Sequence, residues 1–370
     1  MKVRYSYLKQ QFSNCNDLWT KLKKFVATGD FTLGKELNKF EENFAKLIGS
    51  KYAVGVNSGT DAIKLSLKLL DIKKNDEVIT AANTFVATVG AINELGAKII
   101  FVDCNKTFCM DTKLIEKAIN KKTKAIVPVH FSGYMCNMKE LKRISLKYKI
   151  PVIEDACQSI LGEYDGKKAG TWGITGAFSL HPLKNVNVWS DGGIITTNSK
   201  KYYKKLKLLR NHGLISRDKV EILGFNSRLD TFQACVGNWL LPKAKSIANK
   251  RISNAKYLDK GFSNIQQIEI PERYKNQKIV YHLYMVYAKN RNSLYKYCLK
   301  KGVEAKIHYP IPIYRQKALK KISGNKRYPN TDLQSQNLIS FPCDQHLSNK
   351  QMDHIIATVR KFYANKKQIY

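Results

Sequence analysis

Short apolar runs alternate with amphipathic stretches along the chain from about residue 52 to residue 157. The runs have the length and composition of buried strands, whereas the stretches between them carry apolar residues at helical spacing. In SGTDAIKLSLKLL, a Ser-Gly-Thr-Asp start that can cap a helix precedes a face of Ala, Ile and Leu. This alternation predicts an α/β fold with a mostly parallel central sheet and helices on both of its faces.

The pattern changes twice farther along the chain. Two more strands precede a helix at about 199–211, and the alternation ends near Leu241-Pro242. We therefore expect a large domain over 1–242, with a helical N-terminal segment, and a smaller C-terminal α+β domain over 243–370. The expected strands of the large domain are YAVGV, DEVIT, KIIFVDC, KAIVPVH, PVIEDAC, GAFSLH and GGIITTN, with a helix at DTKLIEKAIN; the smaller domain has strands at HLYMVYA and toward KIHYP, around a helix at SLYKYCLKKG.

Polar residues that could carry chemistry follow several of these strands. NSGT follows the first strand, NTF the second, EDACQ the fifth, and a lysine-bearing stretch, FSLHPLKNVNVWSDGG, begins within the sixth. Because parallel sheets bind ligands at the carboxyl ends of their strands, we expect these residues to lie around one site.

Each of these motifs also has an ordinary structural interpretation. Gly59 and Thr60 open a helix whose free N–H groups can bind an anion, although such a cap is common in α/β proteins. Asp155 ends a very apolar strand, where it either pairs with a cation or caps a helix. Lys184 lies among apolar neighbours, so its amine finds a partner, loses its charge or snorkels to the surface. The chain contains neither GxGxxG nor GxxxxGK[ST], which argues against a Rossmann dinucleotide site and a P-loop.

An anion cradle, a buried aspartate and a desolvated lysine together match the needs of pyridoxal 5′-phosphate (PLP). Desolvation lowers the pKa of a lysine and so favours Schiff-base formation with the cofactor aldehyde. An aspartate beside the pyridine nitrogen keeps the ring protonated, and such an ion pair is worth roughly 4 kcal/mol at about 4 Å and a dielectric constant near 20. We therefore predict PLP as the cofactor. No Cys/His cluster has metal-ligand spacing, so no metal is expected.

Six motifs, spread over nearly the whole chain, follow one another in a telling order: FTLGKELNKFEENFAKLIGSKYAVGVNSGTDAI, ANTFVAT, VIEDACQSILGEYDGKKAGTWG, FSLHPLKNVNVWSDGG, GFNSRLDTFQA and KIHYPIPIY. In this order they resemble the DegT-type (DegT/StrS) sugar aminotransferases, which are PLP-dependent transferases of fold type I. The resemblance implies transfer of an amino group from glutamate or glutamine to a nucleotide-linked ketosugar, by a homodimer with shared active sites.

The resemblance also implies a role for each matching residue. Lys184 would form the Schiff base and move the proton between Cα of the donor and C4′ of the cofactor. Asp155 would hold the pyridine nitrogen and Gln158 the phenolic oxygen. The other implied contacts are with the phosphate (Gly59, Thr60 and Ser179), the ring face (Phe85), the phosphate of the neighbouring subunit (Asn226) and the substrate (His181, His308 and Tyr309). Taken singly, Phe85 could instead belong to the core, and Ser179 could be a strand-end hydroxyl.

Two positions depart from the family pattern. Ser190 stands where glycine is common before Asp-Gly-Gly, and Tyr314 stands where a histidine often follows the HYPxPx run. Both segments shape the substrate pocket, so the identity of the sugar stays open. Two other outcomes on the same site also stay open, namely dehydration of a sugar and amination of a sugar that is not carried on a nucleotide. Some relatives with histidine in place of the lysine are dehydratases, and Lys184 argues against that branch.

The composition adds an unusual charge. The chain has 64 Lys+Arg against 29 Asp+Glu, a net charge of +35. Such an excess suggests an anionic partner, and a basic nucleic-acid-binding or regulatory protein that retains the fold is the rival hypothesis. The lysines are spread in pairs along the chain instead of forming one block, so we expect no nucleic acid and a field that attracts a diphosphate substrate.

The remaining features point to a cytoplasmic enzyme. The N-terminus lacks the apolar region of a signal peptide, and no apolar run of about 18 residues is present, so we expect no membrane contact. The eight cysteines include no CxxC pair, which argues against a disulfide framework.

Overall fold

A central sheet of seven strands organises the computed structural model, which describes residues 1–365. Two hydrogen-bonded groups, β1-β9-β8-β5 and β3-β2-β4, are joined by bridges from Ile126 to Val152 and from Val129 to Asp155. Within this sheet β9 runs antiparallel to both of its neighbours and the other pairings are parallel, so the predicted mostly parallel sheet is confirmed. The strands are β1 Tyr52–Val56, β2 Glu77–Ala81, β3 Lys98–Val102, β4 Thr123–Val127, β5 Ile153–Asp155, β8 Thr175–Ser179 and β9 Gly193–Thr197.

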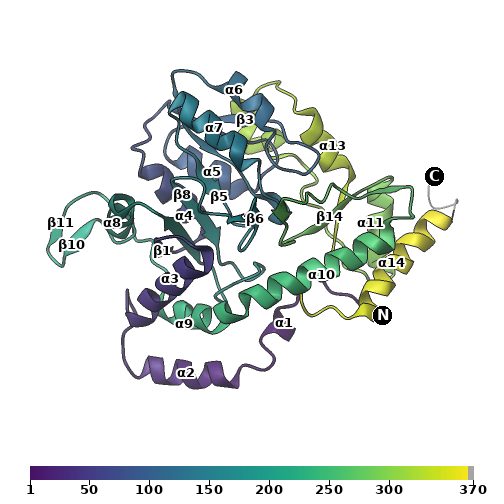
Figure 1. Ribbon diagram of the computed structural model, residues 1–370, viewed down its shortest axis with the longest axis horizontal. Helices are drawn as coiled ribbons and strands as arrows, with labels where there is room; N and C mark the ends of the chain where they lie inside the picture. The colour runs from purple at the N-terminus through teal and green to yellow at the C-terminus, as the bar shows by residue number, and fades with distance from the viewer. Residues whose placement is uncertain (366–370) are drawn as a thin grey trace.

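Helices cover both faces of this sheet, as predicted (Figure 1). Side chains of a strand alternate between faces, so Ala53 belongs to one apolar cluster and Val54 to the other. The first cluster includes α2 Asn16–Val26, α3 Lys35–Ile48, α6 Ile115–Ala118, α7 Met138–Tyr148 and α9 Thr231–Leu240, and the second includes α4 Gly59–Lys68, α5 Val86–Glu94 and α8 Lys200–Leu209.

The C-terminal part of the chain forms a three-stranded antiparallel sheet with helices. Figure 1 shows α10 crossing from α9 toward α11 and α14. Residues of α10 and α14 belong to the same apolar cluster as one face of the central sheet, so the boundary between 242 and 243 stays a prediction. The elements are α10 Ala244–Phe262, β12 Ile268–Glu269, β14 Tyr284–Ala288, α11 Arg291–Lys300, α12 Lys320–Ser323, α13 Pro329–Asn337, β15 Leu338–Phe341 and α14 Asn349–Ala364.

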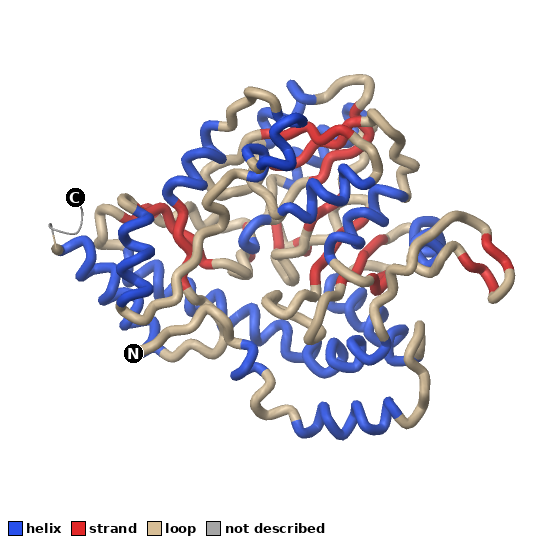
Figure 2. The backbone as a smooth tube through the Cα atoms, turned by 180° about the vertical axis from the view of Figure 1, so that it is seen from behind, coloured by secondary structure: helices blue, strands red, loops and turns tan. Residues whose placement is uncertain are grey.

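Smaller elements complete the described fold. The β10–β11 hairpin projects from the side of the molecule (Figure 2). Val3 pairs with Val303 through an isolated β-bridge, so the N-terminal residues lie against the C-terminal part of the fold. The remaining elements are α1 Leu8–Gln11, β6 Glu163–Tyr164, β7 Lys167–Lys168, β10 Leu214–Ser216, β11 Lys219–Val220 and β13 Gln277–Lys278.

Three local predictions need correction. The strand expected at HLYMVYA begins only at Tyr284, so His282 lies in the loop before it. The strand expected toward KIHYP is reduced to one bridge between Lys306 and Ser340, because the prolines that follow lack the N–H groups that a ladder needs. The helix expected at DTKLIEKAIN is split into a short 3₁₀ turn and the four residues of α6, since the side chain of Asp111 accepts the N–H of Lys113 and tightens the first turn.

Candidate active site

One pocket of about 260 Å³ lies where the carboxyl ends of several sheet strands meet the first turns of α4 and α5. The sheet therefore places its polar loop residues around a single site, as the strand-end argument predicts. Of the predicted site residues, the pocket is lined by Gly59, Thr60, Phe85, Asp155, Gln158, Ser179, His181, Lys184, His308 and Tyr309.

The first turn of α4 forms a cradle for an anion. Ser58 caps the helix, because its hydroxyl accepts the backbone N–H of Asp61 at 3.1 Å. The first N–H groups of a helix have no acceptor within the helix, so those of Gly59 and Thr60 can bind a phosphate. A Cβ at position 59 would lie 2.8 Å from Cβ of Ser179, so only glycine lets the helix approach β8 this closely.

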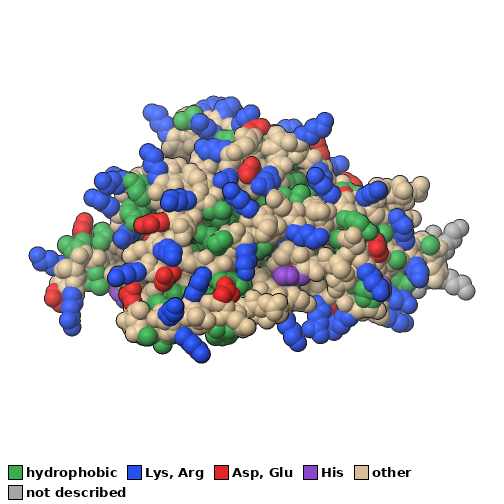
Figure 3. Space-filling model, turned by 60° about the horizontal axis from the view of Figure 1, so that its bottom comes forward, with side chains coloured by type: hydrophobic (Ala, Val, Ile, Leu, Met, Phe, Trp, Pro, Cys, Tyr) green, Lys and Arg blue, Asp and Glu red, His purple; other side chains and the backbone are tan. Residues whose placement is uncertain are grey.

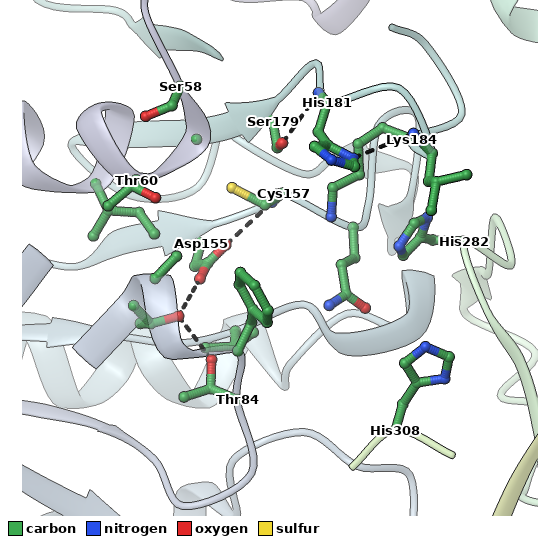
Figure 4. A pocket seen from close by; sticks show the side chains of 18 of the residues that line it. Ser58, Thr60, Thr84, Asp155, Cys157, Ser179, His181, Lys184, His282 and His308 are labelled. Carbon is green, nitrogen blue, oxygen red and sulfur yellow. Dashed lines mark hydrogen bonds between the residues drawn. The ribbon is translucent and has the colours of Figure 1, made fainter. Parts of the chain in front are cut away.

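Asp155 is held by two donors and faces the pocket. Its Oδ2 accepts the hydroxyl of Thr88 at 2.7 Å, and its Oδ1 accepts the backbone N–H of Cys157 at 3.2 Å. The hydroxyls of Thr88 and Thr84 are also 2.7 Å apart, which links Asp155 to the start of α5 (Figure 4). The sequence prediction missed both threonines, although both lie within the ANTFVAT motif.

Lys184 extends into the pocket from the turn between β8 and β9 (Figure 4). Its backbone N–H donates to the carbonyl of His181 at 2.8 Å, and the hydroxyl of Tyr7 donates to the carbonyls of Leu183 at 3.2 Å and Lys184 at 3.0 Å. Burial lowers the pKa of the Lys184 amine, and the nearby Cys157 and Asp155 only partly offset this effect. Lys184 is half-buried and lines the pocket, so its side chain faces this cavity.

Gln158 and Phe85 complete the walls. The Gln158 side chain accepts the backbone N–H of Ser132 through Oε1 at 2.7 Å, so its amide N–H groups are left to act as donors. The alternative that Phe85 belongs to the core is wrong, because 52 % of this residue is exposed. Its ring contacts that of Tyr309, with centroids 6.1 Å apart.

Three histidines line the other side of the pocket, away from Ser58 and Thr60 (Figure 4). Nδ1 of His308 contacts the hydroxyl of Ser340 at 2.8 Å. Burial and the charge of Lys184 lower the pKa of His308 to about 4, and the same two causes lower the pKa values of His181 and His282. His282 was not predicted, because the sequence pattern assigns it to a strand.

Asn226 does not line this pocket, and neither do Ser190 and Tyr314, the two positions that depart from the family pattern. Asn226 is exposed and pairs with Asn211 through a β-bridge, so its predicted contact with a second subunit stays a prediction. Tyr314 is buried, and its hydroxyl donates to Asp332 at 2.6 Å. Ser190 is exposed beside Asp191, which does reach the pocket.

The surface offers no single basic stripe on the face that Figure 3 displays. Lys and Arg side chains are scattered over it and are interrupted by acidic and apolar side chains. None of the helices in residues 1–365 combines the length and the apolar character that a membrane span requires.

The residues present fit PLP. The pocket offers N–H donors for a phosphate, a carboxylate for a pyridinium, an amide donor, an aromatic ring for stacking and an amine of lowered pKa. These are the groups that the sequence motifs predict, now placed around one cavity.

Comparison with known proteins gives a consistent result. The model of the DegT/DnrJ/EryC1/StrS aminotransferase family matches residues 15–360. A dTDP-3-amino-3,6-dideoxy-alpha-D-galactopyranose transaminase of Aneurinibacillus thermoaerophilus is 33% identical over 344 residues, 92% of this chain and 94% of that protein. DesV of S. venezuelae, solved with a ketimine intermediate, has a TM-score of 0.96 at 30% identity over 98% of this chain and 99% of DesV. NtdA of Bacillus subtilis, solved with bound cofactor PMP, has a TM-score of 0.92 at 29% identity over 98% of this chain and 86% of NtdA.

Proposed function

The chain belongs to the DegT/DnrJ/EryC1/StrS aminotransferase family, and we propose that it transfers an amino group from glutamate or glutamine to a nucleotide-linked ketosugar with PLP as cofactor. The observation that carries the proposal is that Asp155, at the end of β5, and Lys184, in the turn after β8, line one pocket. The relatives named above support the substrate class, since one is a dTDP-sugar transaminase.

Each pocket residue has a task in this reaction. When bound, PLP supplies the aldehyde that takes up the amino group and the ring that withdraws electrons. Gly59, Thr60 and Ser179 would bind its phosphate, Gln158 would donate to its phenolic oxygen, and Phe85 would cover its ring. The carboxylate of Asp155 would keep the pyridine nitrogen protonated. Thr88 and the Cys157 N–H fix the orientation of that carboxylate.

Lys184 would act as the general base and acid. Burial lowers the pKa of its amine, which raises the share of neutral amine that can accept the proton leaving Cα of the donor. Because Tyr7 holds the carbonyls of Leu183 and Lys184, the lysine segment stays in place while its side chain moves the proton. His181, His308 and Tyr309, on the same side of the pocket, would contact the sugar.

We further propose a cytoplasmic homodimer with shared active sites. The exposed apolar residues Ile215, Val220 and Leu223 in and after the projecting β10–β11 hairpin support a covered surface there. Asn226 follows this hairpin and would reach the phosphate of the other subunit. The positive charge of the chain would attract the diphosphate of the substrate.

The decisive experiment is product analysis. The purified protein, reconstituted with PLP, is incubated with ¹⁵N-labelled glutamate or glutamine and with dTDP- and UDP-linked 3- and 4-ketosugars. Mass spectrometry should detect a labelled amino sugar from at least one of them, and Lys184→Ala should abolish it. A dehydrated sugar, or amination only of sugars without a nucleotide, would instead establish one of the two alternative reactions.

A further inference from the structure

Arg251 of α10 is a buried cation that forms no ion pair within the described residues, and 3 % of it is exposed. Its Nε donates to Oε1 of Gln345 at 3.2 Å, and its Nη1 donates to the carbonyls of Tyr281 at 3.1 Å and His282 at 3.4 Å. Nη2 is also buried but has no hydrogen-bond partner in the described part of the chain. A buried guanidinium without a counter-ion is costly, so the site is suited to an anion that arrives from outside.

Arg251 lines a cavity of about 90 Å³ that adjoins the active-site pocket. Leu183, His282, Leu283 and His308 line both cavities. Nδ1 of His282 is a second buried nitrogen without a hydrogen-bond partner in the described residues. Two nitrogen atoms without partners therefore belong to residues that border one small cavity.

His282 connects this cavity to the reactive lysine. Figure 4 shows His282 beside Lys184, on the side of the pocket away from Ser58 and Thr60. Burial is the main cause of the lowered pKa of His282, and the charges of Lys184 and Arg251 add to it, so a neutral imidazole lies near both side chains. The small cavity thus adjoins the side of the pocket where Lys184 works, away from the phosphate cradle.

We propose that this cavity binds the carboxylate on Cα of the amino-acid donor, with Arg251 as the charged contact and His282 as the second polar contact. The inference rests on the proposed function and adds the binding site of its donor. Cα of the donor must lie beside the Lys184 amine that takes its proton, so the carboxylate on that carbon needs an anion site next to Lys184. A guanidinium supplies such a site through charge-assisted hydrogen bonds.

Two other residues that line the cavity, Asp344 and Tyr7, shape the proposed site. Asp344 also lines it, but its Oδ1 accepts the backbone N–H of His346 at 2.8 Å, and it forms no ion pair with Arg251 within residues 1–365. This carboxylate would confine an anion to the side of Arg251. The ring of Tyr7 lies against the guanidinium, 4.9 Å from the ring centroid, while its hydroxyl holds the lysine segment. Tyr7 therefore helps to orient both the guanidinium of Arg251 and the backbone of Lys184.

The test compares two ligands that differ in the α-carboxylate. α-Methyl-L-glutamate has the α-carboxylate but no proton on Cα, so its binding to the PLP-loaded enzyme can be followed by absorbance without turnover. 4-Aminobutyrate has no carboxylate on the carbon that bears its amine. Arg251→Met should weaken binding of α-methyl-L-glutamate roughly 10- to 100-fold, the range for a lost hydrogen bond to a charged group, and leave that of 4-aminobutyrate unchanged. Arg251→Lys should retain part of the affinity.

Arg291→Met is the matched control. Arg291 is equally buried, but both of its terminal nitrogens donate to backbone carbonyls, at 2.9 Å and 2.6 Å. This variant should bind both ligands as the wild-type enzyme does. Melting temperature and cofactor absorbance before ligand addition show whether a variant is folded, and if Arg251→Met does not fold, Arg251→Lys and His282→Gln decide the matter.

Three results have different meanings. Unchanged affinity for α-methyl-L-glutamate in folded Arg251 variants overturns the proposal, and so does an equal loss for both ligands, which would mean that Arg251 only supports the pocket. If the carboxylate effect is present but no nucleotide-linked ketosugar is aminated, the donor site stands and the proposed acceptor is wrong.

Discussion

Two consecutive carboxylates at the end of β5, Glu154 and Asp155, are both buried but have different surroundings. Strand alternation directs them to opposite faces of the sheet. The oxygens of Glu154 accept three backbone N–H groups of the 170–173 loop, at 2.7 to 2.9 Å, and contact Nε2 of His130 at 3.0 Å. Asp155 has two donors, Thr88 and the N–H of Cys157, and lines the pocket.

The difference shows that burial alone does not identify a functional carboxylate. Glu154 is surrounded by donors of the fold, so it ties the 170–173 loop to the sheet and has little capacity left for a ligand. Asp155 is oriented by the fold but keeps part of its hydrogen-bonding capacity toward a cavity. The first arrangement stabilises the structure, and the second is suited to a cofactor.

Replacement of Asp155 by asparagine should have the largest effect on activity. An ion pair with a pyridinium is worth roughly 4 kcal/mol at a dielectric constant near 20, so its loss should reduce kcat about 1000-fold. The melting temperature should change little, because the amide oxygen can still accept the Cys157 N–H and the amide NH₂ can donate to the Thr88 hydroxyl. Steady-state kinetics with the reconstituted enzyme measure the first effect and calorimetry the second. Full activity in a folded Asp155→Asn enzyme would show that the reaction does not need the carboxylate of Asp155.

Replacement of Glu154 by glutamine should have the opposite outcome. The new NH₂ group would face backbone N–H groups, so the variant should lose about 3 kcal/mol of folding free energy, the cost of leaving buried hydrogen-bonding groups unpaired. Urea unfolding measures this loss. At temperatures where the variant remains folded, its kcat should stay close to that of the wild-type enzyme. A large loss of kcat without a loss of stability would contradict the structural role of Glu154.

Much of the central sheet could be predicted because its strands are apolar runs punctuated by capping and turn residues. Asp155 and Lys184 could be predicted because each lies in a strand-end motif. The sequence pattern also assigns both carboxylates of β5 to opposite faces, but it does not show that the 170–173 loop returns to surround Glu154.

What the sequence did not predict depends on contacts between distant segments. The Tyr7 hydroxyl donates a hydrogen bond to the carbonyl of Lys184, 177 residues away, and nothing in the local sequence pattern indicates this partner. Arg251 lies on a helix with many basic residues, so only the fold distinguishes it from the exposed ones. His282 was assigned to a strand because aromatic and apolar neighbours follow it, whereas the structure places it in the loop before β14.

Removal of the Thr88 hydroxyl should have an intermediate effect on Asp155. Thr88→Val keeps the shape but deletes the donor to Oδ2, which should cost about 1.4 kcal/mol, or roughly tenfold in kcat. Thr88→Ser keeps the donor and should stay near the wild-type rate. In the Asp155→Asn background the Val substitution should matter much less, because the two changes act on one interaction. Equal effects in both backgrounds would show that Thr88 acts independently of Asp155.

The smallest effect is expected for Cys157→Ala. Cys157 lines the pocket, but it holds Oδ1 of Asp155 through its backbone N–H, which alanine retains. Burial and the charge of Asp155 raise the pKa of the thiol well above its ordinary value, so near neutral pH it stays protonated and contributes neither charge nor nucleophile. The variant should therefore keep kcat within about threefold, and the wild-type thiol should react slowly with iodoacetamide from pH 7 to pH 8. Rapid alkylation would contradict the raised pKa of the thiol, and a loss of kcat like that of Thr88→Val would mean that the side chain as well as the backbone of position 157 supports Asp155.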